Sequence, residues 1–328
     1  MRVEDWRHLP SALVAPLYEA ETLRWRLSLD WDLRPTVEQL ERARAAGTLP
    51  GFVLRGPGQS IVGWTYYVVQ DGSVQIGSLL ARSSDGLRQL LDAVLKSPEA
   101  GGAREVMLFA FPEGEACASA LVRRRFDVTR YWYLRRSLQL PVRTPAGGAA
   151  DVTLRPVAAG DGPDAVRLLA RAYAGQESAR CFAPTGRMEE WARYFAHMTR
   201  GNALGRFEHE ASLVAPGPGG RLQAVAVSTA ISDATLHLAQ LAVDPDAQGH
   251  GLGGRVLDAT IRWGQANGRR LMTLLVNDDN KVARALYDSR GFLPTGYFLC
   301  ARRAALRRTF PLAPPVGDVV AAGSTHPR

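Results

Sequence analysis

The sequence contains few cysteines, and their spacing excludes the simplest cysteine-based architectures. Cys117, Cys181 and Cys300 are the only ones among 328 residues, and no CxxC pair occurs. An odd number of scattered cysteines supports neither a disulfide framework nor a zinc site. We therefore expect each cysteine to be a small buried apolar residue, and we expect no metal.

The sequence also lacks long apolar runs. No stretch approaches the length of about 18 residues that a membrane-spanning helix needs. Residues 1–20 carry acidic residues and no long apolar segment before a small-residue cleavage site, which argues against a secretory signal. These observations predict a cytoplasmic protein with no membrane partner.

The net charge is +8, but the basic residues are dispersed. Their densest groups lie at 122–126, 134–137 and 301–308. Excess positive charge favours anionic partners in general. Nucleic-acid binding also needs stacking or groove-reading residues at defined spacing, and none is recognisable here. We interpret the basic groups as solvated faces and predict no nucleic-acid partner.

The chain does contain an internal repeat. At a constant offset, residues 105–138 resemble residues 270–306, so that Met107 aligns with Met272 and Leu121 with Leu286. Each half is predicted to contain strands, a helix, a strand, a helix and a closing strand. The length also suggests two domains. We predict domains at 1–140 and 152–310, a Pro- and Gly-rich linker at 141–151, and a disordered tail at 311–328.

Apolar periodicity places the elements of the second half more closely. It predicts helices at 161–174, 187–200, 253–268 and 280–291, and strands at 151–157, 234–243 and 270–276. Gly268 and Gly291 are expected to end the last two helices.

The stretch VDPDAQGHGLGGRVLDA at 243–259 joins a strand to a helix through a glycine-rich loop. Its glycines match G-x-G-x-x-G, the fingerprint of nicotinamide dehydrogenases, but there the first glycine follows the strand directly. Residues 244–248 intervene here. A plain turn is a second interpretation. The third is a pyrophosphate site, in which N–H groups at a helix N-terminus and the helix dipole attract phosphate oxygens. His250 and Arg255 could add donors to such a site.

Two motifs resemble a known family. The loop, with Gln248-x-x-Gly251-x-Gly253 after a strand, is similar to the acetyl-CoA motif of the GNAT superfamily of N-acetyltransferases. The later NDDNKVARALYDSRGF resembles the next motif of that superfamily. The resemblance covers 151–308 well and, through the repeat, 30–140 weakly. It implies an α/β (α+β) fold of two tandem GNAT domains, each with a mixed, mostly antiparallel sheet that splays at its middle and is flanked by helices.

The resemblance also implies acetyl-CoA as co-substrate and a role for each motif residue. Backbone groups of Leu241, Ala242 and Val243 would bind the pantetheine arm, and Asn280 would contact that arm. Tyr287 would lie near the thioester sulfur, where its hydroxyl suits a general acid. A backbone N–H near Leu241 would polarise the thioester carbonyl. The pyrophosphate would be held by Gln248, Gly249, His250, Gly251, Leu252, Gly253 and Gly254.

The general base is less clearly indicated. His237 lies on the strand before the loop, where many family members place a carboxylate, and its ordinary pKa of about 6.5 suits the task. Alternation puts His237 on one face with Thr235, Ala239 and Leu241, which allows either a cleft or a core position. Gln240 is a neighbouring cleft candidate.

The family resemblance also indicates an acceptor region. The segment 174–191 tends to cover the acceptor site in the family. Glu177, Arg180 and Glu189 are therefore candidates for reading a polar acceptor, and a solvated helix face is the alternative for each.

The first half lacks the corresponding residues. Its strand at 73–81 is followed by a shorter loop without the glycine pair, Val122 stands in place of Tyr287, and Glu115 stands in place of Asn280. We expect a degenerate first domain that supports the second, a plan that resembles the mycothiol synthases.

Together these features predict an N-acetyltransferase that moves an acetyl group from acetyl-CoA to an amine of unidentified identity. An acyl-CoA-binding sensor without turnover is the main alternative, and an aminoacyl transferase that uses charged tRNA and a nicotinamide dehydrogenase are others. The expected partners are acetyl-CoA and the amine acceptor, and a homodimer is possible.

Overall fold

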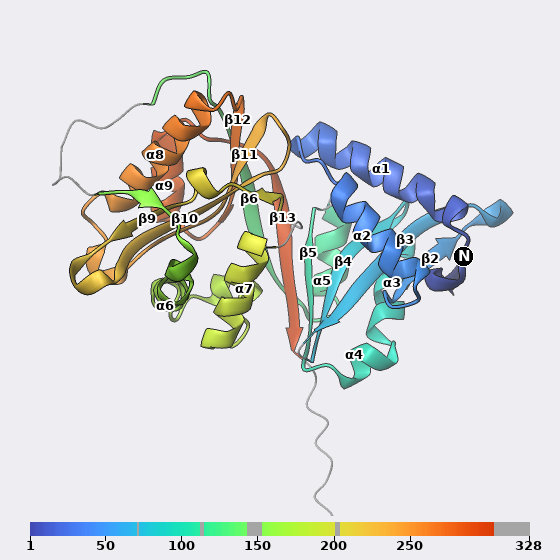
Figure 1. Ribbon diagram of the computed structural model, residues 1–328. Coiled ribbons are helices and arrows are strands. Elements are labelled where there is room, and N and C mark those ends of the chain that lie inside the picture. Colours follow the sequence, from blue (N-terminus) through green and yellow to red (C-terminus); the bar gives the residue numbers. More distant parts are fainter. Residues whose placement is uncertain (71, 112–114, 143–152, 201–203, 305–328) are drawn as a thin grey trace, which may run out of the picture.

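The computed structural model describes residues 1–70, 72–111, 115–142, 153–200 and 204–304 (Figure 1). Most of the linker predicted at 141–151 and all of the tail predicted at 311–328 lie outside these ranges. Within them, no helix is both long and apolar enough to cross a membrane.

The first half alternates strands and helices in the predicted way. Its elements are β1 (Arg2–Asp5), α1 (Ser11–Leu29), α2 (Arg34–Ala45), β2 (Gly51–Arg55), β3 (Ile61–Gln70), β4 (Ser73–Ala81), α3 (Ser84–Leu95), α4 (Pro98–Gly102), β5 (Glu105–Ala110), α5 (Glu115–Val122) and β6 (Asp127–Ser137).

The second half repeats this order with one additional short strand, β8, and without a counterpart of α4 among the residues described. Its elements are β7 (Arg155–Pro156), α6 (Gly162–Ala172), α7 (Met188–Arg200), β8 (Arg206–Phe207), β9 (Leu213–Pro216), β10 (Leu222–Ala230), β11 (Thr235–Val243), α8 (Leu252–Ala266), β12 (Leu271–Asn277), α9 (Lys281–Ser289) and β13 (Leu293–Ala304).

The predicted helices and strands of the second half are present, with small differences at their ends. Gly268 and Gly291 follow α8 and α9 with φ of 70° and 77°, the left-handed conformation that ends a helix. The strand predicted at 151–157 is limited to Arg155–Pro156 among the residues described.

The strands form one continuous, mostly antiparallel sheet, in the order β1-β2-β3-β4-β5-β13-β6-β12-β11-β10-β9-β7, with β8 paired to β10. The halves exchange their closing strands: β6 pairs with β12, and β13 pairs with β5. β6 and β13 also pair with each other at the centre, where Figure 1 shows β13 running between the two lobes. The sheet of each half therefore includes a strand from the other.

Each half has the same irregularity at its middle. The β3–β4 pairing skips Gly77, and the β10–β11 pairing skips Ala239, so each strand carries a bulge. β4 pairs in parallel with β5 only as far as Ile76, and β11 with β12 only as far as Leu238. Beyond these points the neighbouring strands separate, which confirms the expected splay.

Helices cover both faces of the second half. Val256 and Ile261 of α8 are fully buried against Leu238 of β11 on one face. On the other face, Leu169 of α6 and Trp191 of α7 are buried in a separate core. Figure 1 shows α8 and α9 on one side of the sheet and α6 and α7 on the other. The gap between β11 and β12 therefore lies between two helical layers.

The expectation for the cysteines was wrong for two of the three. Cys181, at the end of the short helix η4 (Glu177–Cys181), forms a disulfide with Cys300 of β13, across a sequence separation of 119. Cys117 is free and buried. Spacing along the chain carries no information about this pair, because η4 and β13 meet only when the sheet has formed.

Candidate functional site

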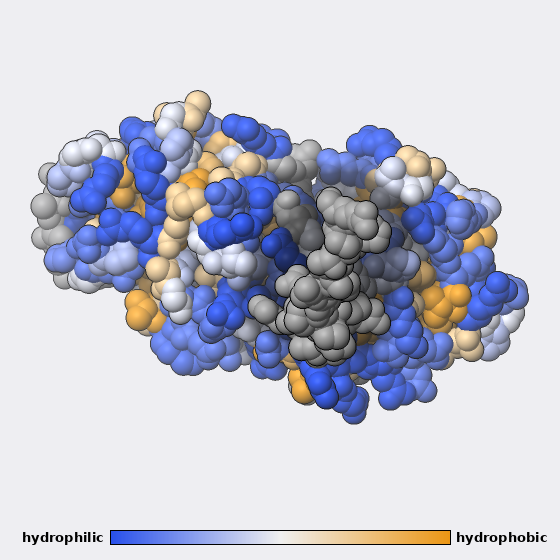
Figure 2. All heavy atoms as spheres, turned by 90° about the horizontal axis from the view of Figure 1, so that it is seen from below, coloured by the Kyte–Doolittle hydropathy of each residue, from blue (hydrophilic) through white to orange (hydrophobic). Residues whose placement is uncertain are grey.

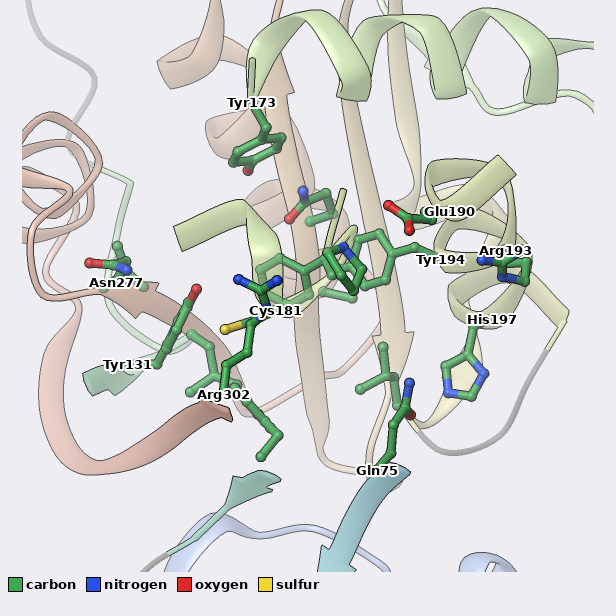
Figure 3. A pocket seen from close by; sticks show the side chains of 18 of the residues that line it. Gln75, Tyr131, Tyr173, Cys181, Glu190, Arg193, Tyr194, His197, Asn277 and Arg302 are labelled. Carbon is green, nitrogen blue, oxygen red and sulfur yellow. The ribbon is translucent and has the colours of Figure 1, made fainter. Parts of the chain in front are cut away.

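A pocket of about 490 Å³ lies where β11 and β12 separate. Its lining includes residues 237–241 of β11, residues 275–277 of β12, and side chains from α7 and α9. Figure 3 shows Asn277 and Tyr131 on one side of it, and Glu190, Arg193 and His197 on the other. The pocket is therefore built at the splay that the fold creates.

The bulge in β11 changes which residues share a face. Val227 pairs with Gln240 and Ser228 with Leu238, so Ala239 is the extra residue. Leu238 and Leu241 consequently both pack in the core beneath α8. The alternation that placed His237 and Leu241 on one face was wrong, because a strand of period two does not anticipate a bulge.

The glycine-rich loop leads directly into α8. Gly249 and Gly251 have φ of 80° and 74°, and Gly251 is the residue immediately before the helix. No side chain in the described part of the chain caps α8, and the first turn of the helix carries no acidic residue. The first N–H groups of a helix have no partner within it, and the helix dipole makes that end positive. This end of α8 can bind an anion.

Ion pairs and small side chains hold the loop in place. Arg171 of α6 lies 3.1 Å from a carboxylate oxygen of Asp244 and 2.8 Å from one of Asp246. The Gln248 side chain donates to the Val243 carbonyl at 3.1 Å. A Cβ at Gly253 would lie 3.3 Å from Val243, tighter than usual, so a glycine there lets α8 approach β11 closely.

The corresponding helix of the first half is closed to anions. Only Arg82 and Ser83 separate β4 from α3. The Ser83 hydroxyl accepts from the Gly86 N–H at 3.1 Å, and Asp85 lies in the first turn. A capped helix end with a carboxylate repels phosphate rather than attracting it.

Two tyrosines line the pocket near the loop. Tyr287 of α9 is buried, and burial raises the pKa of its hydroxyl well above the ordinary value. The Tyr173 hydroxyl lies 3.5 Å from the Leu241 carbonyl, and burial raises its pKa to about 12. Both hydroxyls stay protonated at neutral pH. Tyr173 was not anticipated, because nothing in its local sequence places it beside β11.

Asn280 caps α9 at the mouth of the pocket. Its side-chain oxygen accepts from the Ala283 N–H at 3.0 Å. Asn280 also lines the pocket. Its amide nitrogen is therefore the part of the side chain left for a ligand.

His237 is enclosed rather than exposed to the pocket's solvent. Its Nδ1 lies 2.9 Å from the Thr273 hydroxyl, and its ring lies 5.2 Å from the ring of Trp31, which comes from the first half. Burial lowers the pKa of His237 to about 3. A neutral imidazole with so low a pKa is a weak base, so this environment does not favour the general-base role, which stays a prediction.

Two buried amides in the pocket are poorly satisfied. Gln240 and Asn277 are 8% and 6% exposed, and among the residues described neither Gln240 Nε2 nor Asn277 Nδ2 makes a hydrogen bond of good geometry. Each does lie near a pocket tyrosine, Gln240 near Tyr173 and Asn277 near Tyr131, and partly offsets the effect of burial on the pKa of that hydroxyl. Because buried donors are nearly always satisfied, a ligand that accepts from both amides would complete their hydrogen bonding. Gln240 was expected in the cleft. Asn277 was missed, although a polar residue just after the predicted strand 270–276 was a usable signal.

The predicted acceptor-reading residues lie elsewhere. Glu177 and Arg180 pair with each other at 2.9 Å on the exposed surface of η4. Neither they nor Glu189 line the pocket, whereas Glu190 does. The segment 174–191 thus contributes to the pocket through other residues than the three candidates, whose acceptor-reading role stays a prediction.

Comparison with known proteins identifies a family domain in the second half of the chain. Residues 173–292 match the model of the acetyltransferase (GNAT) family. This range contains β11, the glycine loop, α8, β12 and α9. The second half of the chain therefore carries a GNAT domain, as its motifs predicted. No protein of curated function matches the sequence.

Solved structures show the same fold over most of the chain. A GCN5-related N-acetyltransferase from Sphaerobacter thermophilus aligns with a TM-score of 0.54 at 14% identity, over 77% of this chain and 80% of its own. A tandem GNAT protein from the clavulanic acid biosynthesis pathway aligns with a TM-score of 0.51 at 16% identity, over 78% and 82%. At these identities the likeness shows the fold alone, and it confirms the predicted mixed sheet flanked by helices.

A third likeness spans more of this chain. The glucosamine N-acetyltransferase region of a fungal multidomain GH3 β-N-acetylglucosaminidase aligns with a TM-score of 0.61 at 14% identity, over 92% of this chain and 38% of that one. Both halves of the chain are thus included in a GNAT-like architecture.

Proposed function

We propose that this protein is an acetyl-CoA-dependent N-acetyltransferase in which the second half binds the cofactor and performs the transfer. The contrast between two equivalent helix ends carries the proposal. The N-terminus of α8 is uncapped, free of acidic residues in its first turn and preceded by glycines, whereas α3 is capped by Ser83 and carries Asp85. Only the former suits a pyrophosphate.

Acetyl-CoA would follow the splay of the sheet. Its pyrophosphate would bind the N–H groups of the loop and of the first turn of α8. Its pantetheine arm would lie along Leu241, Ala242 and Val243, which are beyond the last residues that pair β11 with β12. Asn280, at the start of α9, would contact the same arm. The loop residues that would hold the pyrophosphate are Gln248, Gly249, His250, Gly251, Leu252, Gly253 and Gly254.

The reaction would be direct attack of the amine on the thioester carbon. The C–N bond forms and the C–S bond breaks, and the departing thiolate takes a proton from Tyr287. The raised pKa of Tyr287 keeps that proton available. The attacking nitrogen must lose a proton as well. His237 is the candidate acceptor for it. The proposal does not depend on this role, because a neutral amine can attack without a base and its proton can pass to water afterwards, while Tyr287 regains a proton in exchange for the one given to sulfur.

Calorimetry with acetyl-CoA and a thiol-release assay with a panel of amines would test the proposal. We expect heat of binding without an amine, and thiol release when a suitable amine is added. Absence of binding heat would refute the proposal. Binding without release for every amine would instead support the acyl-CoA sensor, which the retained Tyr287 disfavours.

A further inference from the structure

The pocket does not end at the splay but extends onto the first half of the chain. Besides β11 and β12, it is lined by Ser73 and Gln75 of β4, by Glu105 and Phe109 of β5, and by Arg302 of β13. Strand exchange brings these residues together, because β13 of the second half pairs with β5 of the first half. The end of the pocket away from the glycine loop is therefore built by both halves.

Arg302 is held in a fixed orientation at this end. Its Nε donates to a Glu105 carboxylate oxygen at 2.6 Å, and the other oxygen accepts from the Ser73 hydroxyl at 3.0 Å. Glu105 and Ser73 are both buried. The two terminal nitrogens of Arg302 have no partner among the residues described, and Figure 3 shows the guanidinium directed into the pocket.

The carboxylates in the pocket wall are already satisfied. Glu105 is occupied by Arg302 and Ser73. Glu190 accepts from the backbone N–H and the hydroxyl of Thr185 at 2.8 and 2.9 Å. Three arginines line the same pocket, namely Arg104, Arg193 and Arg302. The wall therefore offers a bound molecule the terminal nitrogens of Arg302 rather than an unsatisfied carboxylate.

Other parts of the described surface give weaker evidence for a binding site. The face shown in Figure 2 is mainly hydrophilic where its residues are described, with apolar residues in small separate patches. Such scattered apolar residues are ordinary on a protein surface and identify no partner. The second cavity, of about 70 Å³, lies against the turn between β9 and β10 and is too small for a substrate.

We propose that the amine acceptor also carries an anionic group, a carboxylate or a phosphate, which Arg302 binds while the amine faces the thioester. This inference rests on the proposed transfer reaction and adds the class of its acceptor. The terminal nitrogens of a guanidinium match both anions in a two-point contact. Glu105 and Ser73 act as positioning residues: Glu105 binds the guanidinium, Ser73 binds Glu105, and neither is assigned a contact with the reacting groups. The first half thereby supplies part of the acceptor site.

Matched pairs of amines test the proposal. The panel sets amino acids and short peptides with free carboxylates against the corresponding amides, and phosphoethanolamine against ethanolamine, in the thiol-release assay. We expect kcat/KM to be about 10–100-fold higher for the anionic member of the best pair, as is typical of a charged hydrogen bond. The two arms separate a carboxylate from a phosphate.

Substitutions at and near Arg302 test whether this residue causes the preference for anionic acceptors. Arg302→Gln should lower kcat/KM for the anionic acceptor about 10–100-fold more than for its neutral partner, so that the preference between the two is lost. Arg302→Lys should restore part of the preference, and Glu105→Gln should weaken it. Arg303→Gln is the matched control, because Arg303 is the next residue on β13, points to the opposite face and does not line the pocket.

A binding measurement keeps the test independent of turnover. Calorimetry of the N-acetylated acids and of their amides, in the presence of coenzyme A, should show tighter binding of the acids and loss of that difference in Arg302→Gln. If no acid in the panel is preferred, or if the preference survives in Arg302→Gln, the proposal is overturned while the transferase assignment stands. If acetyl-CoA itself gives no heat, the proposed function fails, and the acids alone still decide whether Arg302 forms an anion site.

Discussion

Gly251 and Gly268 stand at opposite ends of helix α8 and share nearly the same backbone conformation, with φ of 74° and 70°. Neither would bring a Cβ within 4 Å of another atom. A side chain at either position therefore meets the same conformational penalty, about 1–2 kcal/mol, and no clash. Only Gly251 precedes the helix end assigned to the pyrophosphate.

This pair provides a matched test of the cofactor site. Gly251→Ala should lower the free energy of unfolding by about the same amount as Gly268→Ala, and should also weaken coenzyme A binding about tenfold or more because it displaces the loop N–H groups. Calorimetry and thermal unfolding measure the two effects. Equal coenzyme A affinity in the two variants would contradict the assignment of the loop.

Removing the Tyr287 hydroxyl should separate binding from chemistry. Tyr287→Phe keeps the buried ring and its contact with Phe292, whose ring centre is 5.8 Å away. We expect kcat to fall about 10²–10⁴-fold, the range for loss of a general acid, with little change in acetyl-CoA affinity. Tyr173→Phe is the control, since the Tyr173 hydroxyl contacts the Leu241 carbonyl instead. A kcat within twofold of the unchanged enzyme would remove Tyr287 from the mechanism.

The sequence was most informative where function depends on local backbone geometry. The glycine loop, the uncapped start of α8 and the termination of helices at Gly268 and Gly291 are properties of a few consecutive residues, so a single sequence reveals them. The shortened loop before α3 was recognisable for the same reason. The fold class followed from the family resemblance of the two motifs, with which the order of the local elements agrees.

The remainder depends on contacts between distant segments. Ala239 is left out of the pairing between β10 and β11 and thereby shifts the alternation of β11, which the strand's own pattern does not record. Trp31 covers His237 from the first half, and Cys181 reaches Cys300 only when η4 packs on β13. Strand exchange, which places Arg302 beside Glu105, likewise has no local signature.

The cysteines predict how many reactive thiols the protein has under different conditions. Cys117 is buried with its pKa raised to about 11 by desolvation, so its thiol should react slowly in the folded protein. We expect air-oxidised protein to show almost no reactive thiol when folded, one when denatured without reductant, and three after reduction. A thiol reagent monitored by absorbance measures this directly, and three thiols in the denatured, unreduced protein would disprove the Cys181–Cys300 bond.

Loss of that disulfide should also lower stability. The bond joins residues separated by 119 positions, so it restricts a long loop of the unfolded chain. We expect Cys181→Ser to lower the free energy of unfolding by about 2–5 kcal/mol under oxidising conditions. Cys117→Ser provides a comparison at a cysteine outside the bond. Under reducing conditions the penalty of Cys181→Ser should largely disappear, and a penalty that persists would point to packing instead.

Gln240 is expected to weaken the fold in exchange for ligand contact. Its buried Nε2 makes no hydrogen bond of good geometry among the residues described, and an unsatisfied buried donor costs about 1–3 kcal/mol. Gln240→Met, of similar length, should therefore leave the melting temperature unchanged or raise it. The same variant should weaken substrate binding, since the amide can no longer donate. A clear drop in melting temperature would show that the amide is satisfied in the folded protein.

His237 makes a prediction about pH. In the unfolded chain its pKa is near 6.5, whereas burial lowers it to about 3 in the fold. Between these values the unfolded state binds a proton that the folded state does not. The contribution of His237 to the free energy of unfolding is therefore fully present above pH 6.5 and is lost as the pH falls towards 3. In that window the free energy of unfolding should change by about 1.4 kcal/mol per pH unit because of this residue.

His237→Asn, which can retain a contact with Thr273, should remove this pH dependence. The same substitution at the exposed His209 controls for the loss of a histidine as such. Denaturant unfolding at pH 7, 6 and 5 measures how the free energy of unfolding of each variant changes with pH. A wild-type slope unchanged by His237→Asn would mean that the imidazole becomes protonated in the folded protein at its ordinary pKa, which would restore it as a general base.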